Sequence, residues 1–315
     1  MNLDTETRLG YTIPKEMKEV WALQMQITKK LLEVCDRHGL KCWMDSGTLL
    51  GAVRHGGFIP WDDDIDFVML RKDYDKLVAL ADKEFQHPYF FQTTITDDGL
   101  YMGHGKIRYD GTASFIRNEE FERYHRGIDV DIFVLDGFIE NPVLRFIHRK
   151  TTKMLRDSIR YNLIDLKRAK PKPWKRLKIF MAKGLYHFLD YKKAFVLYEN
   201  LFRMVNADKC KRVSVMSHVY TTCRRVRNRS SYDRQEWIPF EDTTYPAPCD
   251  THDTLICYFG ENYMKPVHTP TQHGQRYMDT HRPYQEVEKE LREHPELFEQ
   301  RVRQLYTDVA QTKEY

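Results

Sequence analysis

The amino-acid sequence predicts an α/β fold of the α+β kind, in which helices flank a mixed β-sheet core and the C-terminal half is mainly helical. Three observations predict it. Residues 15–38 carry apolar side chains at helical spacing, the runs 64–70 and 127–135 are rich in strand-forming residues, and helical patterns dominate from residue 142 to about residue 207. With 315 residues, 41% of them hydrophobic, the chain can bury a substantial core.

The first elements follow from apolar periodicity and from breaker residues. A helix is predicted over 15–38, where Gly39 supplies the stop and the apolar positions are Val20, Leu23, Ile27, Leu31 and Val34. A short strand at 41–44, a helical turn or short helix at 47–54 and the loop HGGFIP should follow. The chain then re-enters the sheet at 64–70 and continues into an amphipathic helix over 71–85.

The next segments read as strands. One is predicted over 89–94, and 105–109 with 112–117 should form a hairpin around the turn pair Asp110-Gly111. The run GIDVDIFVL at 127–135 is the third strongly strand-like segment. Near the C-terminus, 284–309 is predicted to be one charged helix.

Composition argues against several classes of protein. We find no run of about 18 apolar residues and no apolar core in the N-terminal segment, so we expect neither a membrane span nor a secretory signal, and a cytoplasmic location. Six scattered cysteines predict reduced thiols rather than a disulfide framework. The spacing of Cys249, His252 and Cys257 matches no familiar zinc pattern.

The net charge of +4 conceals a basic middle third. Residues 145–229 hold 24 Lys and Arg against 5 Asp and Glu. Within it, 167–189 mixes cations with large apolar residues, which is typical of a segment lying on anionic lipid, here at the inner face of a membrane. A solvated basic helix with an ordinary core face is the alternative. No nucleic-acid-binding motif accompanies the charge, so nucleic acid is not expected as a partner.

The stretch GTLLGAVRHGGFIPWDDDIDF, residues 47–67, places glycines shortly before paired aspartates. On a strand, Asp64 and Asp66 project to the same face, where two carboxylates repel each other unless a cation such as Mg²⁺ binds. Asp131 lies in DVDIFVL among apolar neighbours, a costly place for an unpartnered charge. Brought beside the pair, Asp131 would complete a metal site of three carboxylates. A solvated acidic turn is the alternative for 62–66, and one exposed and one capped carboxylate on an edge strand is the alternative for Asp129 and Asp131.

Such a cluster suits phosphoryl-type transfer, in which metal ions neutralise developing charge and a carboxylate accepts the proton of the attacking hydroxyl. Asp131 is the candidate for that proton. Gly47 and Thr48 would let backbone N–H groups approach a phosphate at the start of a helix. The candidate anion contacts of the side chains are Arg54, His55, Lys106 and Arg108, each with a plain surface charge as its alternative.

These motifs resemble the LicD-type cholinephosphotransferases, which are related to the fukutin-related proteins and belong to the nucleotidyltransferase-fold superfamily. The resemblance is specific in DSGTLLGAVRHGGFIPWDDDIDFVMLRKDYDKL and GIDVDIFVLDGF, and looser in GKIRYDGTASF and LICYFGENYMKPV. The chain departs from the family pattern at Asp129, Val134, Phe259 and Asn262.

The resemblance implies a nucleotidyltransferase-like catalytic core at 1–140, and a mainly helical basic region and C-terminal part at 141–315 that completes the active-site cleft. It implies Mg²⁺ or Mn²⁺ held by Asp64, Asp66 and Asp131, with Gly47 and Thr48 at the donor phosphate. The expected donor is CDP-choline or a related CDP-alditol, the acceptor is a sugar hydroxyl of a surface glycan or its lipid-linked precursor, and CMP is released.

Three alternatives remain at this point. The transferred group is ribitol or glycerol phosphate instead of phosphocholine; the protein is a true nucleotidyltransferase that releases pyrophosphate; or it is a membrane-associated scaffold without activity. For choline, aromatic faces such as those of Trp43 and Trp61 would have to recognise the quaternary ammonium.

Overall fold

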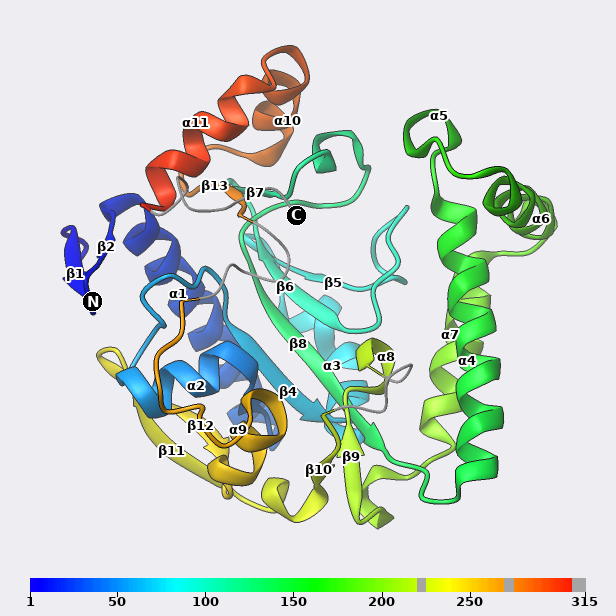
Figure 1. The fold of residues 1–315 in the computed structure, drawn as a ribbon, viewed down its shortest axis with the longest axis horizontal. Coiled ribbons are helices and arrows are strands. Elements are labelled where there is room, and N and C mark those ends of the chain that lie inside the picture. The colour runs from blue at the N-terminus through cyan, green and yellow to red at the C-terminus, as the bar shows by residue number, and fades with distance from the viewer. Residues whose placement is uncertain (220–224, 269–274, 308–315) are drawn as a thin grey trace.

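A computed structural model describes residues 1–219, 225–268 and 275–307 of the chain (Figure 1). Its strands are β1 Glu6–Arg8, β2 Tyr11–Ile13, β3 Trp43–Met44, β4 Asp66–Leu70, β5 Tyr89–Gln92, β6 Gly105–Tyr109, β7 Ala113–Phe115, β8 Asp129–Gly137, β9 Arg212–Ser214, β10 Arg227–Asn228, β11 Gln235–Phe240, β12 Thr243–Pro248 and β13 Tyr277–Asp279. Its α-helices are α1 Lys15–His38, α2 Ser46–His55, α3 Arg71–Glu84, α4 Pro142–Leu163, α5 Leu166–Ala169, α6 Pro173–Phe188, α7 Tyr191–Arg203, α8 Met216–Val219, α9 Thr251–Phe259, α10 Tyr284–Glu293 and α11 Glu296–Leu305.

A seven-stranded mixed sheet forms the centre of the molecule. β8 is its middle strand: it runs parallel to β4 and antiparallel to β6 and β9, while β3, β5 and β10 extend the sheet outward. The predicted α/β fold with a mixed sheet and a mainly helical C-terminal half is therefore confirmed. Strands β9 and β10 come from the part of the chain after residue 141, so both halves contribute to one sheet.

Two apolar layers cover the sheet because successive strand residues point to opposite faces. Phe67 and Met69 of β4 pack into the cluster that contains the buried stripe of α1, whereas Val68 and Leu70 pack with Leu135 in a second cluster. In that stripe Val20, Ile27, Leu31 and Val34 are fully buried and Leu23 is half-buried. Asp66, two positions before Val68, shares the face turned away from α1.

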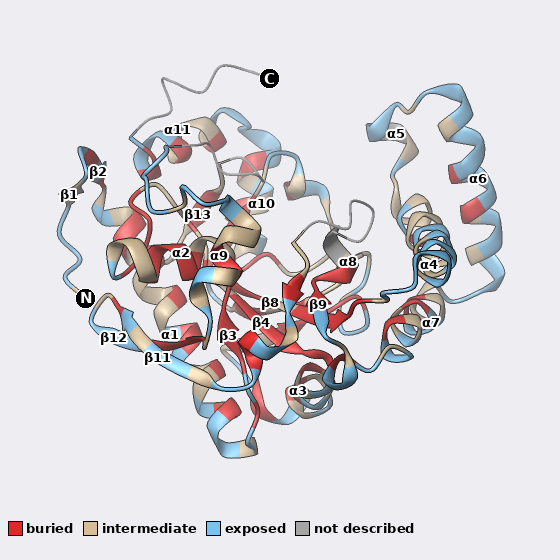
Figure 2. Cartoon of the chain, turned by 60° about the horizontal axis from the view of Figure 1, so that its bottom comes forward, coloured by how far each residue is buried: buried red, intermediate tan, exposed pale blue. Residues whose placement is uncertain are grey.

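Helices α4, α5, α6 and α7 form an arm at one side of the sheet domain (Figures 1 and 2). A third apolar cluster joins the arm to the sheet domain and contains Phe138, Ile159, Phe195, Tyr198, Phe202 and Met216. No helix among the described residues is both long enough and apolar enough to cross a membrane.

The structure corrects two predicted elements. Residues 105–109 and 113–115 are strands on either side of a turn at Asp110-Gly111, but they do not form a hairpin: β6 pairs with β5 and β8, and β7 pairs with β13. The expected single helix at 284–309 is two helices, α10 and α11, with Pro295 between them. Proline lacks the N–H that a continuous helix needs; residues 308 and 309 lie outside the described part of the chain.

Candidate active-site cleft

A cleft of about 710 Å³ opens over the start of β4 and β8. Its walls combine the segment before β4, strands β6 and β8, helix α2 and the segment that follows α9. Polar and aromatic residues line it, namely Ser46, Gly47, Arg54, Trp61, Asp62, Asp64, Asp66, His104, Lys106, Asp131, Arg225, Tyr258, Phe259, Asn262, Tyr263, Lys265 and Arg276. The cleft thus joins motifs that lie more than two hundred positions apart in the sequence.

Asp66 and Asp131 are direct neighbours across two parallel strands. Asp66 opens β4, and the β4–β8 register places it opposite Asp131. Both side chains line the cleft. Asp64 precedes the strand rather than opening it, because β4 begins at Asp66, yet Asp64 also lines the cleft. The three aspartates that the sequence singles out therefore share one cleft.

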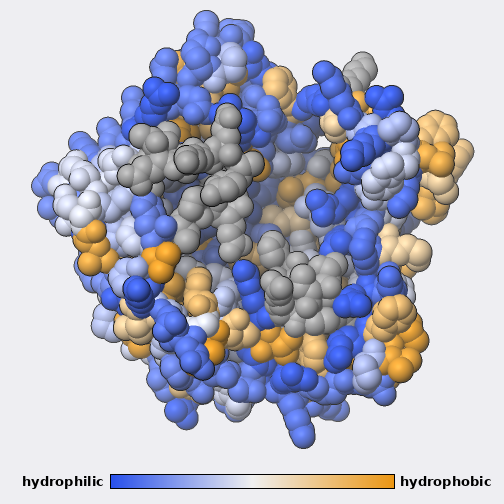
Figure 3. All heavy atoms as spheres, viewed as in Figure 1, coloured by the Kyte–Doolittle hydropathy of each residue, from blue (hydrophilic) through white to orange (hydrophobic). Residues whose placement is uncertain are grey.

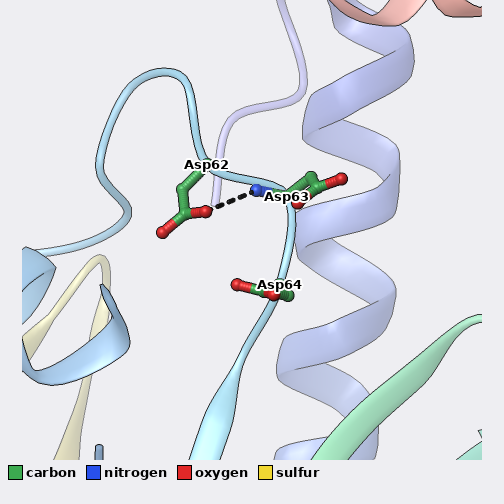
Figure 4. A group of neighbouring side chains, drawn as sticks. All are labelled: Asp62, Asp63 and Asp64. Atoms are coloured by element: carbon green, nitrogen blue, oxygen red, sulfur yellow. Dashed lines mark hydrogen bonds between the residues drawn. The ribbon is translucent and has the colours of Figure 1, made fainter. Parts of the chain in front are cut away.

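The acidic run 62–64 alternates in direction (Figure 4). Asp62 and Asp64 point to the same side and line the cleft, whereas Asp63 points the other way and is buried. The Asp63 carboxylate accepts a hydrogen bond from the Tyr306 hydroxyl of the segment after α11. Asp62, Asp63 and Asp64 each offer a carboxylate oxygen within 4.8 Å of those of the other two. Asp62 is thus a fourth carboxylate in the cleft lining, in addition to the predicted Asp64, Asp66 and Asp131.

The carboxylates in the cleft differ in their electrostatic surroundings. Burial and the negative charges of Asp64 and Asp131 raise the pKa of Asp66 well above its usual range. Asp131 accepts hydrogen bonds from His104 Nε2 at 2.8 Å and from Lys106 Nζ at 2.9 Å. Burial would raise the pKa of Asp131, but Lys106 and His104 outweigh it and hold this pKa well below its usual range. These two partners hold the Asp131 carboxylate in its ionised form beside Asp66.

Cationic side chains also line the cleft. Lys106, Arg225, Lys265, Arg54 and Arg276 all face the cleft. Arg276 lies 3.5 Å from the Asp129 carboxylate, and its Nε has no hydrogen-bond partner among the described residues. Burial would lower the pKa of Arg276, but Asp129, Asp63 and Asp64 raise it overall, so Arg276 stays charged beside the acidic run. Acidic and basic side chains in one cleft suit the binding of a phosphate group together with a metal cation.

Gly47 and Thr48 occupy different places. Gly47 lines the cleft, and a Cβ there would come within 2.5 Å of Asp62 Oδ2, so a larger residue would force that carboxylate to shift. Thr48 is buried and does not line the cleft: its Oγ1 accepts a hydrogen bond from Asp66 N at 2.8 Å. The Thr48 side chain thus ties α2 to the first residue of β4 instead of facing a ligand.

Of the four predicted anion contacts, two line the cleft and two do not. Lys106 and Arg54 line it, with Arg54 Nη1 donating to the backbone oxygen of Tyr263 at 2.9 Å. Arg108 is buried and donates to Asp129 Oδ1 at 2.6 Å and to Gln92 Oε1 at 2.8 Å. Lys106 and Arg108 share one strand face, as expected, but Arg108 forms an ion pair with Asp129 within the protein.

His55 lies outside the cleft lining as a neutral acceptor. Its Nε2 lies 2.8 Å from Arg54 Nε, which donates to it. Burial and the nearby charges of Arg54 and Arg8 lower the pKa of His55 to about 4. A neutral imidazole that already accepts a hydrogen bond from Arg54 adds no positive charge for an anion, so the expected anion contact is not supported at His55.

One buried ion pair beside the cleft was not predicted from the sequence. Asp45, directly before α2, accepts hydrogen bonds from Arg227 Nη1 at 2.7 Å and Nη2 at 3.0 Å, and from the Tyr258 hydroxyl at 2.8 Å. Both partners of the ion pair are fully buried. The pair links α2, β10 and α9, and so fixes the C-terminal motif against the glycine motif. An arginine with an apolar i−1 neighbour in a basic segment is too common a pattern to have indicated it.

His104 was also missed. It packs on Phe133 with ring centroids 4.4 Å apart and contacts Asp131 from the cleft side. Its place two positions before Lys106, on the same face of an extended segment, is the signal that could have found it.

A divalent cation fits the donor set of this cleft. Asp62, Asp64, Asp66 and Asp131 supply carboxylate oxygens, the ligands that Mg²⁺ and Mn²⁺ prefer. The raised pKa of Asp66 reflects repulsion among these groups, which a bound cation would relieve.

The mixed sheet and its carboxylate-lined cleft agree with a nucleotidyltransferase type of domain. Residues 39–154 match the family model described as the LicD/FKTN/FKRP nucleotidyltransferase domain. Residues 39–154 of this chain are therefore similar to a LicD-type nucleotidyltransferase domain.

Two kinds of relative support this assignment. The lipopolysaccharide cholinephosphotransferase LicD of Haemophilus influenzae is 26% identical over 236 residues, which cover 74% of this chain and 85% of the relative. The ribitol 5-phosphate transferase FKRP of Homo sapiens is 38% identical over 59 residues, 19% of this chain and 12% of the relative, and FKRP of Mus musculus matches equally.

Proposed function

We propose that this protein transfers a substituted phosphate, in the first place phosphocholine, from a CDP-linked donor to a sugar hydroxyl of a surface glycan or its lipid-linked precursor. The general class, a phosphotransferase that modifies glycans, rests on the LicD-family domain and on relatives that are named cholinephosphotransferase and ribitol 5-phosphate transferase. The CDP donor, the divalent metal and the release of CMP are the finer parts of the proposal.

The pairing of Asp66 with Asp131 is the observation that carries the proposal. It places two carboxylates side by side at the floor of a cleft that also holds Asp62, Asp64 and several cations. Mg²⁺ or Mn²⁺, when bound there, would neutralise charge on the phosphate oxygens. The residues that would hold it are Asp64, Asp66 and Asp131, with Asp62 within reach.

The reaction exchanges one phosphorus–oxygen bond for another. The sugar oxygen forms a bond to the phosphorus that bears choline, and the bond from that phosphorus to the CMP oxygen breaks, so the electron pair leaves with CMP. The hydroxyl proton passes to a carboxylate of the cluster. Lys106, Arg54 and Arg276 are the candidates for holding the non-bridging oxygens of the donor, because they face the cleft beside the carboxylates.

Aromatic side chains in the cleft favour choline over an alditol. Trp61, Tyr258, Phe259 and Tyr263 line it and offer ring faces to a quaternary ammonium. Trp43, the other aromatic candidate of the sequence, is fully buried in the second apolar layer and donates Nε1–H to Arg234 O at 3.1 Å. Trp43 is therefore a core residue, and Trp61 is the tryptophan that remains for choline.

The deciding experiment is incubation of the purified protein with Mg²⁺, a surface-glycan acceptor and, in separate reactions, CDP-choline, CDP-ribitol and CDP-glycerol, with CMP measured in each. We expect CMP from CDP-choline, and its loss in Asp66→Asn and Asp131→Asn by about a hundredfold or more. Asp98→Asn is the control, since Asp98 is 88% exposed, pairs with Lys192 and lies outside the cleft lining, and it tests whether any lost aspartate charge inactivates the protein.

Each other outcome selects another activity. If CMP forms from CDP-ribitol or CDP-glycerol but not from CDP-choline, the protein transfers an alditol phosphate. Pyrophosphate formed from CTP and a phosphorylated substrate would identify a true nucleotidyltransferase. If calorimetry shows no metal-dependent binding of any donor, the protein is a scaffold and the proposed enzymatic activity is wrong.

A further inference from the structure

The outer face of α6 exposes an unusual amount of apolar surface. Phe188 is 86% exposed, Phe180 is 72% exposed and Trp174 is 60% exposed. Leu177, Met181 and Leu185 are exposed on the same helix. Figure 3 shows hydrophobic side chains along the edge of the molecule at which Figure 1 places this helix. Contiguous apolar surface of this kind marks a contact with another molecule or with a membrane.

The exposed residues of α6 form one face. At 100° per residue, Trp174, Leu177, Phe180, Met181, Leu185 and Phe188 fall within an arc of about 140°. Ile179 and Ala182, the buried residues of α6, lie outside this arc. The helix is therefore apolar on two sides: one side serves the fold, and the other faces solvent.

Cations border the exposed face. Lys178 Nζ lies 5.2 Å from the centroid of the Trp174 ring, and Arg176 is exposed on the other border, next to Phe180. Along the whole arm, residues 142–204 contain 17 Lys and Arg against 4 Asp and Glu. Lys150 Nζ lies 5.4 Å from the ring of Phe146, an exposed residue of α4, in the same arrangement of cation and aromatic ring.

We propose that α6 docks the protein on the surface of a bilayer that contains anionic lipid, with its aromatic and aliphatic face inserted at the headgroup boundary. Apolar side chains flanked by Lys and Arg are the composition of helices that lie in a membrane interface. The charge of the arm selects the occupant, because an anionic headgroup layer complements it and an apolar protein face with the same basic charge would repel it. This docking is independent of the reaction in the cleft, since none of the α6 residues lines the cleft.

The test is co-sedimentation of the full chain with vesicles. Equimolar phosphatidylglycerol and phosphatidylcholine vesicles should bind the protein, pure phosphatidylcholine vesicles should bind it much less, and added salt should weaken binding. The double variant Phe180→Ser/Phe188→Ser should bind the anionic vesicles at least about tenfold more weakly, because two exposed rings are removed from the inserted face.

Trp237→Ser is the matched control, since Trp237 is 56% exposed on β11, away from the arm. It should leave vesicle binding unchanged, and both variants should keep the circular dichroism and the CMP release of the unmodified protein. Equal binding of the double variant and the unmodified protein would overturn the proposal, as would equal binding to both kinds of vesicle. A dimer seen by light scattering that Phe180→Ser/Phe188→Ser dissociates would assign the face to a second copy instead.

Discussion

Asp45 and Arg227, 182 positions apart, form a fully buried bidentate ion pair that joins the start of α2 to β10. The hydroxyl of Tyr258 donates to the same carboxylate at 2.8 Å. Ser46, which follows Asp45, has a φ of 45°, a left-handed conformation that is uncommon for a residue with a side chain. The ion pair thus anchors the backbone immediately before the Gly47 turn, where that conformation must be held.

Removing the arginine of this pair should destabilise the protein strongly. Arg227→Met leaves the Asp45 charge buried without its partner, and we expect a loss of about 3–5 kcal/mol in the free energy of unfolding, measured with urea. Arg229→Met is the control, because Arg229 pairs with the more exposed Asp208 and Asp233 and should cost about 1 kcal/mol or less. Similar losses for the two variants would contradict a special role of the buried pair.

The repulsion around Asp66 predicts a variant that is more stable and less active. The pKa of Asp66 is raised in the folded protein, so the folded state holds this proton more tightly than the unfolded state does, and stability falls as the pH rises through that pKa. Without metal at neutral pH, Asp66→Asn should therefore stabilise the fold by about 1 kcal/mol or more.

The same pair of proteins tests the metal site. Added Mg²⁺ should raise the melting temperature of the unmodified protein and should have a much smaller effect on Asp66→Asn, because binding to the folded state alone stabilises it. Calorimetric scans with and without Mg²⁺ give both comparisons. An equal Mg²⁺ response in the two proteins would remove Asp66 from the metal site.

His55 should make the protein less stable in weak acid. Its folded pKa of about 4 is depressed, so the unfolded chain binds the proton first and stability is lost as the pH falls below about 6.5 toward 4. Between pH 7 and pH 5 the loss due to His55 should be about 1–2 kcal/mol after allowance for its partial exposure. His55→Gln, whose side-chain oxygen can still accept from Arg54, should reduce this pH dependence in urea unfolding, and an unchanged slope would refute the assignment.

Two glycines of α2 and α6 should respond oppositely to alanine. Gly47→Ala places a Cβ 2.5 Å from Asp62 Oδ2, so it should displace this carboxylate and lower CMP release about tenfold or more, with a smaller effect on stability. Gly184 has open space around the added carbon, and Gly184→Ala should stabilise α6 by about 0.5–1 kcal/mol without changing turnover. Full activity of Gly47→Ala would show that Asp62 is free to move without consequence.

Sequence reasoning succeeded where the deciding contacts are local. The helix predicted over 15–38 is α1 to the residue, and the strands predicted at 64–70 and 127–135 are β4 and β8 with ends shifted by two residues. The hairpin failed because β7 pairs with Tyr277–Asp279, and such a distant partner leaves no trace in local pattern. Helix α11 was merged with α10 because their charged periodicity continues across Pro295.

The cleft was predictable in part for the same reason. Its aspartates and the motif around Tyr263 stand in recognisable stretches, and the structure brings both to one cavity. The environments of Thr48, His55 and Arg108 depend on which face of the element turns inward, and the sequence does not determine that for short elements. Asp45 and Arg227 could not be paired from sequence, because they lie 182 positions apart and Arg227 is one of several arginines in its segment.

The parallel register of β4 and β8 restricts insertions and deletions within these two strands. Inserting one residue into β8 before Asp131 would turn that carboxylate to the α1 side of the sheet, and inserting two would restore its face but move it about 6.6 Å along the strand. Most of the 236 aligned positions differ between this chain and the Haemophilus protein, which is 26% identical. An insertion or deletion within β4 or β8 would change which side chains face the cleft. The site therefore depends on the spacing of residues along these two strands as well as on their identity.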